Sequence, residues 1–347
     1  MGVLEIFFAI LGISVLVIVH ESGHYLVARA FKMRVLRYSI GFGPALFRYK
    51  PKGSPTTFQV CAIPFLAYVQ IAGMNPHEEF DESDPAVFAN KGLFARISTI
   101  AAGPVANYLA ASVLVFGLAL VGWPESETIE PMTVGHVEEG SPAHAAGIEV
   151  GDVIVEANGT PIANVQDLID VTSPRPDQPT EYVVSRDGER LAPMMITPKD
   201  TEGRGIIGVR AKGRRIYVPQ SLGEAAERAV VYPVEFTLMQ IAGIAGMITE
   251  GSIDELKGPV GMGKIVAEQV QQGPAEFVLI LVLLSVALGF FNLLPFPALD
   301  GGRLVFLAYE LITRRRPNER FEAMVHTVGI LILLAVLALV TFRDIVN

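Results

Sequence analysis

The stretch "VLVIVHESGHYLVARAF", residues 15–31, decides how the rest of the sequence is interpreted. It is apolar enough to lie in a membrane, yet it carries His20, Glu21 and His24 in its middle. Ionisable side chains at membrane depth are costly, so they are seldom present for packing alone. On a helix, the spacing of four residues places the two imidazoles on one face, one turn apart. There they can share a metal ion while Glu21 reaches a water molecule beside it, so the stretch predicts a metal site inside an apolar helix.

The composition favours an integral membrane protein. Of the 347 residues, 51% are hydrophobic and 18% are charged, which is too apolar for an ordinary soluble domain. The formal net charge of -9 gives no indication of a nucleic-acid partner. The single cysteine excludes an internal disulfide and a zinc site built from several cysteines.

Four stretches are long and apolar enough to cross a bilayer, which takes roughly 20 residues. They lie near residues 3–28, 98–121, 277–297 and 324–342. The loop after the first stretch is basic from Arg29 to Lys52, so the positive-inside rule places it in the cytoplasm and the N-terminus outside. The same rule places "RRRP", residues 314–317, in the cytoplasm. We therefore expect four transmembrane helices, two within residues 1–122 and two within residues 259–347, with both termini and the intervening segment outside.

A fifth stretch, residues 230–248, leaves an alternative open. Pro233, Glu235 and Gln240 weaken it as a membrane span, and a fifth span would move "RRRP" to the outer side. We expect instead an amphipathic helical segment, residues 221–258, that lies on the outer surface of the membrane.

Two further segments have β-sheet patterns. Residues 34–73 contain two β-rich runs broken by glycine and proline. We expect a sheet that dips against the membrane on its cytoplasmic side and can hold an extended peptide at its edge; the alternative is a solvated hairpin. Residues 130–212 alternate strand, turn and short-helix patterns, and "GDVIVEANG", residues 151–159, makes them resemble a bacterial PDZ domain. The predicted fold is thus a multi-pass α-helical membrane protein with a membrane-associated β-rich segment and one inserted extracytoplasmic α+β PDZ domain.

Two histidines do not complete a catalytic zinc site, which usually has three protein ligands. His326 and Glu310 are possible third ligands, but "NLLPFPALDGGRLVF", residues 292–306, is the more suggestive segment because two prolines break its helix before Asp300. At 1.5 Å per residue, His20 and Asp300 both fall near the cytoplasmic edge of a hydrocarbon core about 30 Å thick. With five spans, Asp300 would emerge on the opposite side.

Four motifs together resemble the site-2 protease family of intramembrane zinc metalloproteases, in its bacterial branch that carries a PDZ domain. These motifs are "HESGH", "GFGPAL", "AAGPVANYLAA" and "NLLPFPALDGG", and with the PDZ-like insertion they cover nearly the whole chain. The resemblance implies a metalloendopeptidase with one Zn²⁺ held by His20, His24 and Asp300, and with Glu21 as general base.

The resemblance also implies substrate-binding positions at Asn292 and Asn107. It implies single-pass transmembrane substrates of the anti-sigma-factor type, first shortened by an extracytoplasmic site-1 protease, and an active site near the cytoplasmic side of a bacterial inner membrane. A PDZ domain implies partners with peptide tails, although it can also be a steric plug; several relatives carry tandem PDZ domains, whereas residues 123–276 have room for one. The alternatives are a membrane-tethered PDZ adaptor with a non-catalytic metal and a general protease that clears remnant signal peptides. Glu21 beside an incomplete ligand shell favours an enzyme, because structural zinc sites are usually closed by four ligands.

Overall fold

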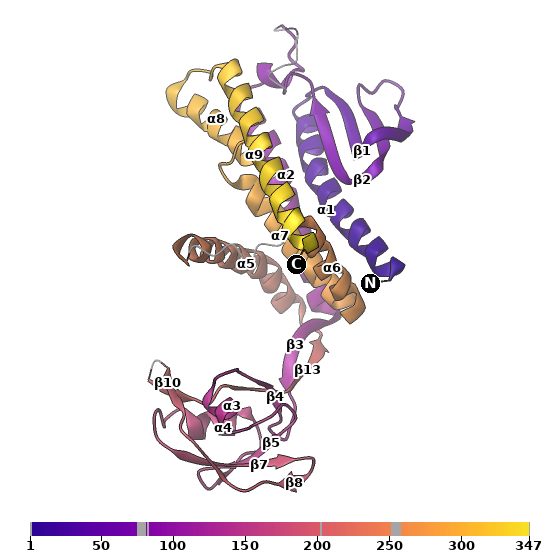
Figure 1. Cartoon of the computed structure of the whole chain (residues 1–347). Coiled ribbons are helices and arrows are strands. Elements are labelled where there is room, and N and C mark those ends of the chain that lie inside the picture. The colour runs from indigo at the N-terminus through magenta and orange to yellow at the C-terminus, as the bar shows by residue number, and fades with distance from the viewer. Residues whose placement is uncertain (1, 75–80, 82, 202, 251–257, 347) are drawn as a thin grey trace. The chain divides into compact units, whose positions relative to one another are not determined.

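The chain divides into two compact units in a computed structural model that describes all residues except 1, 75–80, 82, 202, 251–257 and 347. One unit comprises Met1–Gly122 and Pro219–Asn347, and the other comprises Trp123–Val218. The helices of the first unit, shown in Figure 1, are α1 (Val3–Ala30), η1 (Phe88–Asn90), α2 (Leu93–Gly122), α5 (Leu222–Glu250), α6 (Pro259–Gln272), α7 (Pro274–Leu293), α8 (Asp300–Thr313) and α9 (Glu319–Val346). Its strands are β1 (Val35–Tyr49) and β2 (Thr57–Ile71).

The centre of the helical unit is formed by α1, α2 and α7, which pack against one another. Small residues allow their backbones to approach closely, as is usual for helices that associate in membranes. A Cβ atom on Gly23 of α1 would lie 2.2 Å from the carbonyl oxygen of Ala102 on α2. A Cβ atom on Gly289 of α7 would lie 3.0 Å from the carbonyl oxygen of Pro104, also on α2. The helix that carries the two histidines is therefore fixed against α2.

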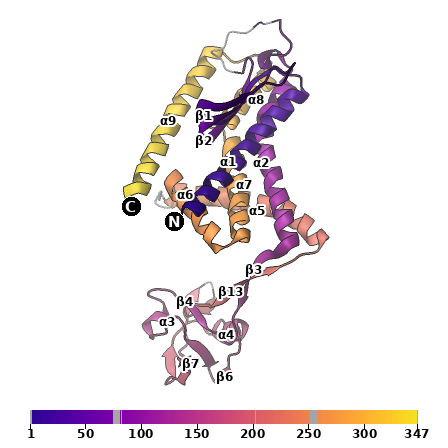
Figure 2. The same cartoon turned by 90° about the vertical axis from the view of Figure 1, so that its right-hand side faces the viewer.

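The structure confirms a membrane protein with a β-rich part. Five helices in the described part of the chain, α1, α2, α5, α7 and α9, are long and apolar enough to cross a membrane. The predicted spans 3–28, 98–121 and 324–342 lie within α1, α2 and α9, whereas the predicted span 277–297 extends four residues beyond the end of α7 at Leu293. Helix α5 covers residues 230–248, which the sequence left as either a fifth span or a helix on the membrane surface. It runs across the direction of α1 and α2 in both views (Figures 1 and 2). Since α5 also qualifies by length and composition, the number of spans stays a prediction. Residues 251–257 of the expected amphipathic segment lie outside the described residues.

Helices α6 and α8 are additions to the sequence prediction, which had two transmembrane helices over residues 259–347. Helix α8 begins at Asp300 directly after the loop 294–299. That loop folds back onto the first turn of α8: a Cβ atom on Gly301 would lie 2.0 Å from the carbonyl oxygen of Leu294, and one on Gly302 would lie 2.4 Å from that of Phe296. The Gly-Gly pair after Asp300 thus permits the tight return of the chain.

Strands β1 and β2 form an antiparallel hairpin attached to α1, in which residues 37–40 of β1 pair with residues 57–60 of β2 on one side and with residues 67–70 on the other. The hydroxyl group of Tyr38 on β1 lies 2.8 Å from that of Ser22 and donates a hydrogen bond to the carbonyl oxygen of Ile18 at 3.1 Å. The hairpin also exposes the large apolar side chains of Phe42 and Phe47. It is therefore anchored beside the histidine motif and presents an apolar surface farther along its strands.

The unit Trp123–Val218 has its own core, built around fully buried side chains such as Tyr182, Ile154 and Val184. Its main sheet has the strand order β6-β5-β7-β8, with β9 paired to β7. The predicted domain, residues 130–212, is shorter than this unit because β3 and β13 pair with each other outside that range. That it is a PDZ domain stays a prediction. The elements are β3 (Trp123–Thr128), β4 (Val134–Val137), α3 (Pro142–Ala145), β5 (Val153–Ala157), β6 (Thr160–Pro161), α4 (Val165–Thr172), β7 (Thr180–Arg186), β8 (Glu189–Arg190), β9 (Met194–Ile196), β10 (Lys199–Thr201), β11 (Arg204–Ile206), β12 (Val209–Ala211) and β13 (Gly213–Val218).

Candidate metal centre

Three side chains with metal-ligating atoms meet where α1 faces the start of α8. The Nε2 atoms of His20 and His24 lie 3.2 Å apart, and Oδ2 of Asp300 lies 3.1 Å from the first and 3.2 Å from the second. Both histidines are 6% exposed. Ligands bound to zinc at about 2.0–2.1 Å in tetrahedral geometry lie about 3.3 Å from one another. The three atoms therefore have the spacing of three corners of a tetrahedral zinc site.

The hydrogen bonds around the group leave electron pairs directed at a common point. Nδ1 of His24 lies 2.8 Å from the carbonyl oxygen of Thr99 on α2, which can only accept, so this nitrogen carries the ring proton. Nε2 of neutral His24 then has a free electron pair facing Asp300. Oδ2 of Asp300 is itself buried, and no described residue donates a hydrogen bond to it. A buried carboxylate oxygen between two imidazoles fits a cation ligand, and the donor set of two nitrogens and one oxygen fits Zn²⁺.

Asn107 on α2 lies against the other ring nitrogen of His20. Its side-chain amide nitrogen is placed 3.2 Å from Nδ1 of His20, its amide oxygen has no hydrogen-bond partner among the described residues, and the residue is fully buried; a rotation of the amide group by 180° exchanges the two atoms. If Nε2 of His20 faces a metal, Nδ1 carries the proton and needs an acceptor, which the Asn107 amide supplies when its oxygen faces the ring. The main-chain oxygen of Asn107 accepts a hydrogen bond of 2.9 Å from Ser285 on α7. Asn107 thus ties the orientation of one ligand to the packing of α2 on α7; its predicted contact with substrate stays a prediction.

Gly103 on α2 provides the space in which the ligand atoms meet. A Cβ atom there would lie 2.3 Å from Nε2 of His24 and 2.8 Å from Nε2 of His20. This glycine belongs to the motif "AAGPVANYLAA", and the family resemblance implied no role for it. The only sequence signal was a glycine next to proline within an apolar helix, and that signal does not reveal a contact with a histidine on another helix.

Glu21 lies between the two histidines in sequence and close to the three-ligand group. The main chain of Val69 on β2 is hydrogen-bonded to its carboxylate, and the charges of the neighbouring ligands act on it. Because it is half-buried and is not one of the three converging residues, its carboxylate is available for proton transfer. The bond to Val69 also brings this carboxylate beside the hairpin.

The remaining candidates from the sequence have other partners. The side-chain amide of Asn292 donates to the carbonyl oxygen of Leu288 at 2.9 Å within α7, and the described residues show no hydrogen bond from it to the three-ligand group. Glu310 accepts two hydrogen bonds, of 2.9 and 2.5 Å, from the guanidinium group of Arg96. Nδ1 of His326 accepts a hydrogen bond of 3.1 Å from the main-chain N–H of Ala298. Of the three candidates for a third ligand, the structure brings Asp300 to the histidines and engages the other two elsewhere.

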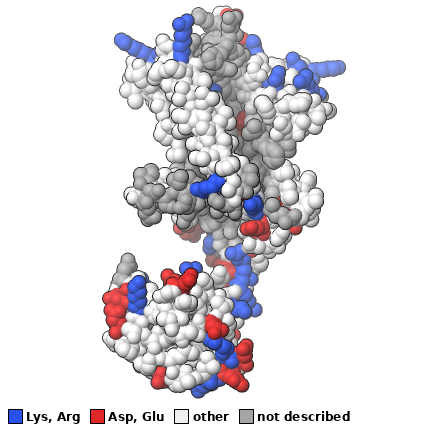
Figure 3. Space-filling model, in the orientation of Figure 1, with Lys and Arg blue, Asp and Glu red and all other residues white. Residues whose placement is uncertain are grey.

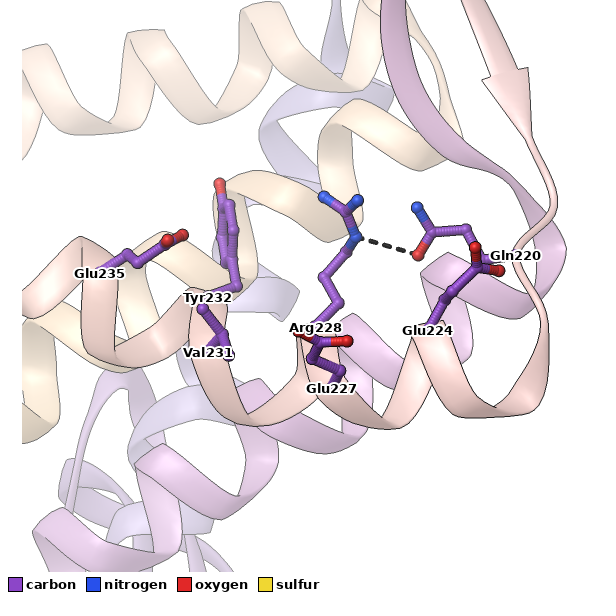
Figure 4. A pocket seen from close by; sticks show the side chains of 7 residues that line it. All are labelled: Gln220, Glu224, Glu227, Arg228, Val231, Tyr232 and Glu235. Carbon is purple, nitrogen blue, oxygen red and sulfur yellow. Dashed lines mark hydrogen bonds between the residues drawn. The ribbon is translucent and has the colours of Figure 1, made fainter.

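A separate hollow lies along the first turns of α5 (Figure 4). Its lining includes Glu224, Glu227, Glu235 and Arg228, whose Nε donates to Gln220 at 2.9 Å. None of its lining residues belongs to the three-ligand group. We assign this hollow no part in the chemistry.

The comparisons with known proteins agree on one kind of enzyme. The sequence matches the description "Peptidase family M50" over residues 8–336. It is 33% identical to metalloprotease MmpA of Caulobacter vibrioides, over 96% of this chain and 93% of that protein. It is similar to two proteins whose given names are those of zinc metalloproteases. One, from Rickettsia conorii, is 30% identical over 97% of both chains, and the other, from Mesorhizobium japonicum, is 32% identical over 96% of both.

Proposed function

The chain belongs to peptidase family M50, and from this premise we propose that it cuts single-pass membrane proteins within their transmembrane segments. It is a zinc metalloprotease of the site-2 type and an integral membrane protein. The observation that carries the proposal is the position of the three-ligand group: two of its members lie in the apolar helix α1, and the group is buried against α2. A zinc site built into membrane helices supports substrates that are themselves in the membrane.

In this proposal, His20, His24 and Asp300 hold the zinc ion. Bound zinc lowers the pKa of water toward neutrality and polarises a peptide carbonyl group. Glu21 takes the proton of the attacking water and delivers it to the leaving amine, which is the usual work of a general acid–base residue. Asn107 and the carbonyl oxygen of Thr99 fix the two imidazole rings so that both Nε2 atoms face the ion.

The β1–β2 hairpin is the element we propose to hold the substrate. A transmembrane helix satisfies its carbonyl groups internally, so the segment must unwind before a peptide bond can be attacked. Residues 37–40 of β1 pair on both sides with β2, so the sheet ends at residues 67–70 of β2 on one side and at residues 47–49 of β1 on the other. An extended peptide can add to such an edge. The hydrogen bond between Val69 on β2 and Glu21 supports this role, because it links the hairpin to the proposed general base. Asn292 remains a proposed substrate-binding residue, as the family resemblance implies.

We propose a four-span topology with α5 on the outer membrane surface. Lys and Arg side chains gather at the end of the helical unit that carries the hairpin and the turn between α8 and α9, and a band with few charged side chains follows (Figure 3). By the positive-inside rule this end is cytoplasmic. The direction of α5 across α1 and α2 supports a surface position. The termini and the unit Trp123–Val218 are then extracytoplasmic, and the membrane is the bacterial inner membrane.

For the unit Trp123–Val218 we propose a PDZ domain that inspects peptide tails. The substrates would be regulators of the anti-sigma-factor type, cut first by an extracytoplasmic site-1 protease. A deletion tests this role cleanly, because Thr128 on β3 pairs with Gly213 on β13. Residues 129–212 can be replaced by a two-residue Asn-Gly turn that keeps this strand pair. The variant should cut a wider range of substrates with unchanged zinc affinity, whereas a folded variant that cuts nothing argues against a filter.

The substitution Glu21→Gln tests two alternative functions, a protease that clears remnant signal peptides and a membrane-tethered adaptor. Glu21→Gln should keep zinc and lose cleavage of a model transmembrane substrate in liposomes by about 10²-fold or more. Proteomics of membrane fractions should then show accumulated substrates, and their identity separates a signalling protease from one that clears remnant signal peptides. Cleavage at the wild-type rate would favour a membrane-tethered adaptor with a non-catalytic metal.

A further inference from the structure

The loop 294–299 brings Asp300 to the histidines in a backbone conformation that needs support. Ala298, two residues before Asp300, has a φ of +82°. This left-handed region is unfavourable for residues with a Cβ atom, by about 1–2 kcal/mol. Such a conformation persists only where the surrounding structure holds it. The contacts of this loop therefore determine where the Asp300 carboxylate lies.

Helix α9 supplies one side chain that touches the chain on both sides of Asp300. Nδ1 of His326 accepts the hydrogen bond from the main-chain N–H of Ala298 at 3.1 Å. The same imidazole packs on the ring of Phe306 in α8, with 5.6 Å between ring centroids. The His326 side chain is 14% exposed. It thus contacts both the loop before the proposed ligand and the helix after it.

Gly329 allows the backbone of α9 to approach the loop closely. It lies three residues after His326, on the same face of the helix. A Cβ atom at Gly329 would lie 2.3 Å from Cβ of Pro297 and 2.7 Å from its carbonyl oxygen. Gly329 is buried, whereas residues 330–339 of α9 are exposed. Close packing of this part of α9 is therefore concentrated where it meets the loop.

We propose that His326 is a positioning residue that sets the Asp300 carboxylate at the zinc site, and that Gly329 permits the contact. The inference rests on the proposed function, in which Asp300 is a zinc ligand. The hydrogen bond from Ala298 requires an unprotonated Nδ1, so the ring is neutral and carries its proton on Nε2. His326, which the sequence offered as a possible ligand, then acts through the loop and not on the metal.

The test is the zinc dissociation constant of the full chain in detergent, measured by chelator competition. In His326→Asn the amide oxygen can take the place of Nδ1 as acceptor, whereas in His326→Gln the amide lies farther out. We expect His326→Ala and His326→Gln to weaken zinc binding by about 10- to 100-fold, as for other residues that orient metal ligands. His326→Asn should remain close to the wild type. On zinc-saturated enzyme the defective variants should lower kcat and leave KM for the model substrate unchanged. Thr327→Ala, a neighbour on the same helix, is the control and should change neither quantity.

Two further variants separate the possible failures. Asp300→Ala with unchanged zinc affinity would overturn the proposed function. Zinc binding lost in Asp300→Ala but retained in both His326→Ala and His326→Gln would overturn only the positioning role. If His326→Ala does not fold, equal affinities of the Asn and Gln variants overturn the proposal, and tighter binding by the Asn variant supports it. Gly329→Ala should also weaken zinc binding, in contrast to Gly243→Ala, where nothing lies within 4 Å of the added Cβ atom; equal affinities of these two variants would contradict the close contact.

Discussion

The substitution Gly103→Ala places one methyl group at the point where the proposed zinc ligands meet. The added carbon would lie 2.3 Å from Nε2 of His24, 2.6 Å from its Cε1 and 2.8 Å from Nε2 of His20. Ordinary contact for a Cβ atom begins near 3.4 Å, so the His24 ring must retreat by about 1 Å. Bonds between zinc and its ligands tolerate only about 0.2 Å. The methyl group and a bound ion therefore cannot both be accommodated without loss of a ligand.

The expected loss in zinc affinity is large. Removing a correctly placed ligand should cost at least about 100-fold in the dissociation constant, or about 2.7 kcal/mol. The free energy of unfolding of the metal-free protein should fall by about 1–3 kcal/mol, as is usual for an extra methyl group in a packed core. We therefore expect the Gly103→Ala protein to fold but to bind zinc much more weakly than the wild type.

The assay is chelator competition for zinc together with thermal unfolding of the metal-free protein. Gly117→Ala on the same helix is the matched control, because nothing lies within 4 Å of its added Cβ atom. The control should bind zinc as the wild type does. Wild-type zinc affinity in a folded Gly103→Ala protein would refute the site geometry.

Two further predictions concern stability. Asp152 accepts hydrogen bonds from Arg186, which lower the pKa of its carboxyl group below the usual value, and the N–H of Glu149 adds to this. A depressed pKa stabilises the folded state above the ordinary carboxyl pKa of about 3.9 and loses that effect as pH falls through the lower folded value. Hydrogen exchange of residues 123–218 in the intact protein should therefore show about 1–3 kcal/mol less protection on acidification through this range, and Arg186→Met should remove most of the change; identical pH profiles would contradict the assignment. Arg96→Met removes the bidentate partner of the half-buried Glu310 carboxylate, which keeps only Arg316 at 3.9 Å among the described residues, and should cost about 1.5–3 kcal/mol in unfolding; the Arg96→Met/Glu310→Leu double variant should recover part of this loss. A loss under about 1 kcal/mol would mean the pair behaves as a surface pair.

The sequence predicted the long apolar helices and the three-ligand group for identifiable reasons. Apolar stretches of sufficient length have few alternatives to helix in a membrane protein, and the four-residue spacing of His20 and His24 fixes their common face. Asp300 could be predicted because two prolines break the apolar helix before it. The depth calculation assumed a helix that continues to residue 300, whereas α7 ends at Leu293 and a loop carries the chain to Asp300. The structure brings these three residues together; their roles as zinc ligands stay predictions.

The contacts that support the group could not be predicted from the sequence. Thr99, Gly103 and Asn107 act on histidines of another helix, and which of their atoms meet depends on how α1 packs on α2. Likewise, the presence of a histidine at position 326 does not reveal whether its ring binds a metal or accepts a hydrogen bond from a backbone N–H. The short helices α6 and α8 were missed because their sequences are less apolar than the spans beside them. The β3–β13 pair was missed because 84 residues lie between Thr128 and Gly213.

The most direct test is X-ray absorption at the zinc edge of the variant Asp300→Cys, compared with the wild type. The wild-type chain has one cysteine, Cys61, which is buried in the hairpin. The account predicts only nitrogen and oxygen ligands near 2.0–2.1 Å in the wild type and one new sulfur ligand near 2.3 Å in the variant. Zinc bound to the variant without a sulfur neighbour would show that residue 300 is not a ligand and would contradict the central claim.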